Sequence, residues 1–142
     1  MVLATTDDRE LNRKIVDQAK KMRCYAYAAD DPEVSDFAFG SVINIEDTVQ
    51  IAVSTGGKSP AMSRKLRLQA EKIFKKLVKK EDIYHIKLQD YARKEAKKKI
   101  DTFPERKKFL YAVMNDKRIK QLIEDENLKM AQRRVIEMLG DL

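Results

Sequence analysis

The stretch "STGGKSPAMSRKL", Ser54–Leu66, marks the point where the sequence changes from strand patterns to helix patterns. Just before it, apolar and polar residues alternate in "TVQIAVS", which is typical of a half-buried strand. After it, apolar residues recur every three or four positions, which is typical of an amphipathic helix. The two glycines permit a turn with positive φ, Ser59 is a good N-cap, and Pro60 suits the first helical position. The stretch therefore predicts a β-containing part followed by a helical part.

The same loop raises the question of a bound phosphate. "GKS" at Gly57–Ser59 matches the end of the phosphate-loop signature, but that signature needs a glycine at position 52, where this chain has Ala52. The sequence therefore does not predict a nucleotide triphosphatase. A helix N-terminus still offers unpaired N–H groups to an anion, and Lys58 and Arg64 add positive charge. We predict that the loop binds a carboxylate or phosphate without recognising a nucleotide.

Upstream of the loop, the pattern indicates strand, helix and strand. Val2–Thr5 is a short apolar run, residues 7–22 have helical spacing with a capping box from Asp7 to Glu10, and Cys24–Ala29 alternates as a strand does. Strand, helix and parallel strand form the βαβ unit of a doubly wound sheet. Residues 37–44 and 48–54 then predict a β-hairpin, whose free edges need a partner such as a second copy of the chain.

These patterns predict an α+β fold in three parts. Residues 1–30 form the end of a Rossmann-type βαβ unit, residues 31–60 a small β-hairpin dimerisation region, and residues 61–142 a C-terminal helical lobe. We further predict a homodimer with the strands of residues 37–54 at its interface.

Composition restricts the kinds of partner. The chain has 142 residues and a net charge of +7, and because residues 1–57 carry 6 basic and 10 acidic side chains, residues 58–142 carry +11. Such a positive field attracts anionic ligands without choosing among them. No apolar run is long enough to span a membrane, and the N-terminus does not resemble a secretory signal, so we expect a cytoplasmic protein. With one cysteine, Cys24, and one histidine, His85, we expect no disulfide and no metal site.

Acidic residues follow the second predicted strand in the segment "DDPEVSD", residues 30–36. Ligands of open α/β sheets bind at the carboxyl ends of the strands, where a catalytic carboxylate is expected. "DDP" is also an ordinary turn sequence. The residues alone leave both interpretations open.

Three segments, "LATTDDRELNRKI", "YAADDPEVSDFAFGSV" and "VQIAVSTGGKSPAMSRKLR", together resemble the siroheme synthase family. These are precorrin-2 dehydrogenases, and some members also act as sirohydrochlorin ferrochelatases. The resemblance implies an oxidoreductase of siroheme and porphyrin biosynthesis that converts precorrin-2 to sirohydrochlorin with NAD, and a homodimer. It also implies an anionic tetrapyrrole as ligand, with ferrous iron or cobalt as the substrate of any chelatase reaction.

The resemblance also assigns roles to residues of this chain. Asp30 matches the catalytic aspartate, which is expected to handle protons. The loop beside the tetrapyrrole is matched by Thr55, Gly56, Gly57, Lys58 and Ser59, with Arg64 behind it as a further substrate-binding residue. The border of the NAD site is matched by Thr5, Thr6 and Asp7.

One departure from the family concerns the cofactor. The glycine-rich dinucleotide fingerprint is absent from this sequence, so we expect the isolated chain to bind NAD poorly and to be inactive without the first half of the Rossmann domain. That half would belong to a longer enzyme or come from a partner. The alternatives are a basic helical module that binds nucleic acid and a non-catalytic dimerisation region. Nucleic acid is disfavoured, because no recognised nucleic-acid motif is present.

Overall fold

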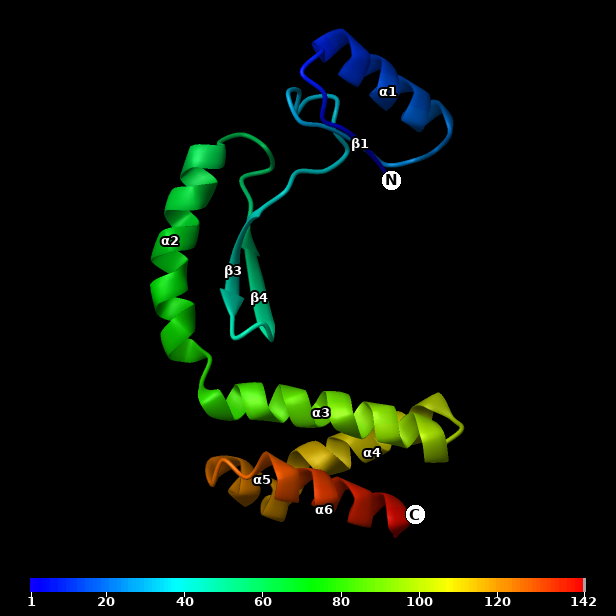
Figure 1. The fold of residues 1–142 in the computed structure, drawn as a ribbon, viewed down its shortest axis with the longest axis vertical. Coiled ribbons are helices and arrows are strands. Elements are labelled where there is room, and N and C mark those ends of the chain that lie inside the picture. The colour runs from blue at the N-terminus through cyan, green and yellow to red at the C-terminus, as the bar shows by residue number, and fades with distance from the viewer. Residues whose placement is uncertain (142) are drawn as a thin grey trace. The chain divides into compact units, whose positions relative to one another are not determined.

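The computed structural model describes residues 1–141, and its helices and strands confirm the predicted α+β fold with a helical C-terminal region (Figure 1). Two compact units share the chain: residues 1–43 with 50–73, and residues 44–49 with the chain from Phe74 onward. The elements are β1 (Val2–Ala4), α1 (Arg9–Lys21), β2 (Ala26–Ala28), β3 (Ser41–Ile45), β4 (Val49–Val53), α2 (Pro60–Leu77), α3 (Lys80–Lys99), α4 (Phe103–Asn115), α5 (Lys117–Glu124) and α6 (Leu128–Gly140).

The predicted βαβ unit is present in the first unit. β1 and β2 pair in parallel, with Val2 opposite Ala26 and Ala4 opposite Ala28. α1 covers these strands with Val16 and other small apolar side chains that are buried against them. Because the strands are parallel, their carboxyl ends lie at the same edge of the sheet. Residues just after position 4 and just after position 28 are thereby brought together.

The start of α1 differs by one residue from the prediction. Asp8, not Asp7, is the N-cap, and its Oδ1 accepts hydrogen bonds from the backbone N–H groups of Glu10 at 2.9 Å and Leu11 at 3.0 Å. Either aspartate could serve as a cap on chemistry alone. Because the Glu10 N–H bonds to Asp8, the capping box predicted from Asp7 to Glu10 was wrong.

The outer edge of β2 is closed by side chains. The Ala28 N–H donates to Ser35 Oγ at 2.9 Å, and the Ala26 N–H donates to Asp36 Oδ2 at 2.8 Å. The Asp36 N–H donates in turn to the Ala26 carbonyl at 2.8 Å. Residues 31–36 thus occupy the place where a neighbouring strand would make its hydrogen bonds.

The hairpin of β3 and β4 is shorter than predicted. Its turn places Glu46 and Asp47 at φ of 48° and 49°, as a type I′ turn requires, and the Thr48 N–H donates to the Ile45 carbonyl at 3.1 Å. Residues 37–40, which were predicted to belong to the first strand of the hairpin, lie outside it. The rings of Phe37 and Phe39 in this segment pack instead against a ring on β2, that of Tyr27, with centroids 5.6 and 5.0 Å away.

α2 begins as the sequence predicts. Pro60 is its first residue, and Ser59 Oγ accepts a hydrogen bond from the Met62 N–H at 3.3 Å. One turn later, the buried Ser63 hydroxyl donates to the Val53 carbonyl at 2.6 Å, at the end of β4. This hydrogen bond joins the helix to the hairpin strand that precedes the glycine loop.

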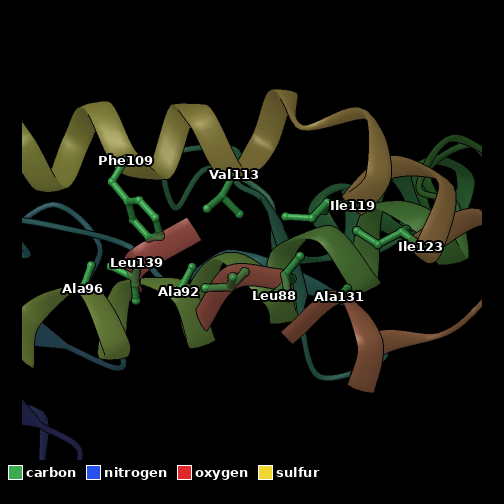
Figure 2. Packing of buried hydrophobic residues seen from close by; sticks show 10 residues of the cluster. Leu88, Ala92, Ala96, Phe109, Val113, Ile119, Ile123, Ala131 and Leu139 are labelled. Atoms are coloured by element: carbon green, nitrogen blue, oxygen red, sulfur yellow. The ribbon is translucent and has the colours of Figure 1, made fainter. Parts of the chain in front are cut away.

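Most of the second unit is a helical lobe, in which α3–α6 surround one apolar core (Figure 2). Phe109 and Val113 of α4 point toward α3, while Ile119 and Ile123 come from the neighbouring α5. Arg134 of α6 ties the helices at the surface, because it hydrogen-bonds Glu137 and also Asp116, the N-cap of α5. These two contacts raise the pKa of Arg134 above its ordinary value.

No helix within residues 1–141 combines the length and the apolar character needed to span a membrane.

Candidate functional site

A buried asparagine connects the carboxyl ends of the two parallel strands. Asn12, on the inner face of α1, is 1% exposed. Its Oδ1 accepts hydrogen bonds from the Thr6 hydroxyl at 2.7 Å and the Thr6 N–H at 3.0 Å, and its Nδ2 donates to the Thr6 carbonyl at 2.9 Å. The second Nδ2 hydrogen bond goes to Asp30 Oδ1 at 2.8 Å. Asn12 therefore holds Thr6, after β1, and Asp30, after β2, at fixed positions.

One carboxylate oxygen of Asp30 accepts a hydrogen bond from Asn12, and the other is accessible. Oδ1 accepts from Asn12, whereas Oδ2 has the Arg9 Nε as a cationic neighbour at 3.8 Å, too far for a hydrogen bond. The side chain is 31% exposed, so solvent or a ligand can reach it. An oriented carboxylate with an accessible oxygen can accept or donate a proton.

Asp31 has different surroundings from Asp30. Its side chain is 14% exposed, and its Oδ2 lies 3.8 Å from Arg9 and 3.9 Å from Arg13. Its Oδ1 accepts the Glu33 N–H at 3.2 Å, and its carbonyl accepts the Ser35 hydroxyl at 2.9 Å. Asp31 thus organises the turn that follows β2.

The glycine loop is ordered by its own hydrogen bonds. Gly56 and Gly57 have φ of 61° and 77°, the left-handed conformation that glycine adopts without strain. The Ser59 N–H donates to Thr55 Oγ1 at 3.0 Å, and the Lys58 N–H donates to the Thr55 carbonyl at 3.2 Å. Two of the N–H groups expected to bind an anion are therefore already paired within the loop.

Gly57 places this loop against the turn that follows Asp30. A Cβ atom at Gly57 would lie 3.2 Å from Pro32 Cβ and 3.7 Å from Ala38 Cβ. The absent side chain is what allows this close approach. The structure therefore brings together the two segments that were singled out in the sequence, residues 30–32 and residues 55–59.

Other predicted site residues remain at the surface without such contacts. Lys58 and Arg64 are exposed, and neither forms an ion pair within residues 1–141. Thr5 and Asp7 are likewise exposed beside Thr6. Both cations are free to meet an anionic ligand, but the geometry assigns them no partner.

Asn12, Arg9 and Arg13 were not predicted to belong to the site. A signal was available for Asn12, because it precedes Val16 and Ala19 at helical spacing and so falls on the buried face of α1. A polar residue on such a face needs hydrogen-bond partners. Arg9 and Arg13 carried no comparable signal, because charged residues on the other faces of a helix are common.

Neither a resident metal nor a complete dinucleotide site is formed by the described residues. Within residues 1–141, no group of three or more His, Cys, Asp or Glu side chains could hold a metal ion. The four glycines of the chain are at positions 40, 56, 57 and 140, away from the turn between β1 and α1. Residues 1–141 by themselves thus do not fit a dinucleotide, whose pyrophosphate needs a glycine-rich turn at a helix N-terminus.

Two known families match the parts of the chain that contain these residues. Residues 1–41 match a family described as "Putative NAD(P)-binding", and residues 47–69 match one described as "Sirohaem biosynthesis protein central". The first match contains Thr6, Asn12 and Asp30, and the second contains the glycine loop. The contact between Gly57 and Pro32 therefore connects a residue of the second match with a residue of the first.

Individual relatives agree with these matches. Siroheme synthase 2 of Aeromonas hydrophila is 28% identical over 94% of this chain and 27% of its own length, and siroheme synthase of Tolumonas auensis is 28% identical over 98% and 29%. Siroheme synthase of Gluconacetobacter diazotrophicus is 41% identical over 51% of this chain and 15% of its own length. The chain thus spans less than a third of the length of these relatives. These matches bear out the predicted resemblance to siroheme synthases, and the NAD(P)-binding match of residues 1–41 supports NAD as the cofactor of a complete enzyme.

We expect the two glycines to respond differently to alanine. Gly56→Ala introduces only the backbone strain of a left-handed residue, about 1–2 kcal/mol, because nothing lies within 4 Å of its Cβ position. Gly57→Ala adds the contact with Pro32 to the same strain, so it should lower the free energy of unfolding further. Urea denaturation of both variants measures the difference, and equal losses would show that the loop does not pack on Pro32.

Proposed function

We propose, from the kinship of this chain with the siroheme synthases, that it forms part of an NAD-dependent precorrin-2 dehydrogenase that produces sirohydrochlorin. The observation that carries the proposal is the 2.8 Å hydrogen bond from Asn12 to Asp30, which orients a partly exposed carboxylate at the carboxyl end of a parallel strand. The packing of the glycine loop on Pro32 supports it, because the loop predicted to bind an anion then adjoins that carboxylate.

We assign a role in the reaction to each candidate residue of this chain. Asp30 would take or give a proton at Oδ2, since Oδ1 is engaged by Asn12. Lys58 and Arg64 would attract the carboxylates of the tetrapyrrole, because both are exposed and unpaired within residues 1–141.

NAD, when bound, accepts the hydride. Thr5, Thr6 and Asp7 would border the cofactor on one side. Metal insertion by a chelatase would use the same carboxylate, with iron or cobalt as substrate.

Replacement of Asp30 tests the catalytic assignment. In a chimera in which this chain replaces the matching segment of the Tolumonas auensis siroheme synthase, Asp30→Asn should abolish NAD-dependent formation of sirohydrochlorin. Asparagine keeps the acceptor for Asn12 but cannot exchange a proton. Asp31→Asn is the matched control and should retain most of the activity, because that carboxylate serves the turn. Equal loss in both variants, or none in Asp30→Asn, would contradict the role of Asp30.

The loop cations can be tested on the isolated chain by calorimetry. We expect sirohydrochlorin to bind, with an affinity that falls as salt rises because exposed charges provide much of the attraction. The double variant Lys58→Gln and Arg64→Gln should bind less tightly than the control Lys65→Gln and Lys72→Gln, which removes two exposed charges from α2 outside the glycine loop. NAD should show no micromolar binding. Tight binding of a DNA duplex without tetrapyrrole binding would favour the nucleic-acid alternative instead.

We also propose that the chain forms a homodimer through the strands of residues 37–54. Phe39 and Val42 are 62% and 52% exposed. In the same unit, α2 carries apolar side chains that are 42–65% exposed at helical spacing, namely Met62, Leu66 and Ile73, and they could extend the interface. Exposed large apolar side chains that gather on one face are typical of a protein interface. A second copy would cover it symmetrically.

A charge placed on β3 should weaken this dimer. Val42→Asp puts a carboxylate at the centre of the proposed interface, where it would lose its hydration. Sedimentation equilibrium at tens of micromolar should then give the monomer mass, whereas the parent chain should give the dimer mass. Gln18→Glu, which adds the same charge at an exposed position of α1 outside the proposed interface, should also give the dimer mass. A monomeric parent chain would contradict the proposal.

A further inference from the structure

A groove runs between α3 and α4 of the helical lobe. It consists of two adjoining cavities of about 690 and 650 Å³, and both are lined by Gln89, Arg93 and Met114. All of its residues belong to the second unit. The larger cavity falls within the roughly 300–1,000 Å³ range of small-molecule sites.

The charges that line the larger cavity have one sign. Arg93 and Lys97 come from α3, and Arg106 and Lys107 come from α4. The carboxylates of the groove, Asp82 and Asp90, line the smaller cavity, and none lines the larger one. Arg106 is engaged, because it donates to the carbonyls of Ile100 at 2.9 Å and Asp101 at 3.0 Å. Within residues 1–141, the other three form no ion pair. Such cations on both sides of one cavity repel each other, so a bound anion would be stabilised between them.

The surface between these cations is apolar and aromatic. Phe103, Tyr111 and Met114 line the cavity and are 71%, 54% and 41% exposed. Tyr111 and Met114 lie three residues apart on α4, so they share one face of that helix. A flat ring can pack on aromatic and thioether side chains while its substituents reach the charges.

We propose that the larger cavity of this groove binds a small amphiphile with a flat aromatic body and at least two carboxylates, away from Asp82 and Asp90 of the smaller cavity. One carboxylate would meet Arg93 and Lys97 on α3, and another would meet Lys107 on α4. The aromatic body would cover Tyr111 and Met114 between them. The guanidinium of Arg93 can hold a carboxylate through two parallel hydrogen bonds. The proposal rests on α3 and α4 alone and does not depend on the function proposed for Asp30.

The test uses naphthalene-2,6-dicarboxylate as probe, with binding to the full chain followed by NMR chemical shifts. We expect saturable binding, with shifts concentrated at residues 89–114. Two partial probes separate the contributions: 2-naphthoate keeps the ring with one carboxylate, and succinate keeps two carboxylates without the ring. Both should bind more weakly than the complete probe. Equal affinity for succinate would contradict the aromatic contact.

Matched variants make the test specific to the groove. Arg93→Gln with Lys107→Gln should weaken binding about tenfold or more, because two charge-assisted contacts are lost. Lys87→Gln with Lys117→Gln removes the same charge from exposed positions that do not line the groove and should change affinity less than twofold. Equal weakening by both pairs would overturn the proposal, as would absence of saturable binding. Groove shifts caused only by an acidic peptide or a DNA duplex would also overturn it.

Discussion

The buried amide of Asn12 is the constraint on which the geometry of the N-terminal unit depends. A buried amide without partners costs free energy, and here its oxygen and both of its N–H groups are satisfied by Thr6 and Asp30. These partners follow two different strands, so α1, β1 and β2 must keep one relative arrangement for all the hydrogen bonds to form. The orientation of the Asp30 carboxylate is therefore a property of the whole βαβ unit. Its own turn alone would not fix it.

Local chemistry made some features predictable from sequence. Gly56, Gly57 and the Ser59–Pro60 pair specify their turn and helix start without help from distant residues, and the structure confirms them. Residues 37–40 were mispredicted because their alternation suits a strand, whereas the contact of Phe37 and Phe39 with Tyr27 depends on tertiary structure. Asp8 in place of Asp7 as the cap reflects two adjacent residues of equal capping ability.

The candidate site was predictable in its parts but not in its assembly. The segments around Asp30 and Gly57 each carried a local signal, yet their contact through Pro32 joins residues 25 positions apart and depends on how the hairpin returns the chain. Net charge likewise does not predict which cations lie at a binding site. Some cations of the helical lobe are paired with nearby carboxylates, as Lys94 is with Asp90, while Arg93 next to it in sequence lines the α3–α4 groove. Composition alone cannot distinguish these two kinds of cation.

Side chains occupy the hydrogen-bonding edge of β2, so a further strand can pair with this small sheet only at the edge of β1. Since the N–H groups of Ala26 and Ala28 already bond to Asp36 and Ser35, a foreign strand has no free donors to pair with there. Any additional strand must join beside β1. Edge-to-edge aggregation through β2 is thereby suppressed, and the acidic turn that carries Asp30 is never covered by a neighbouring strand. The same few hydrogen bonds thus end strand pairing at β2 and keep the carboxyl end of that strand accessible.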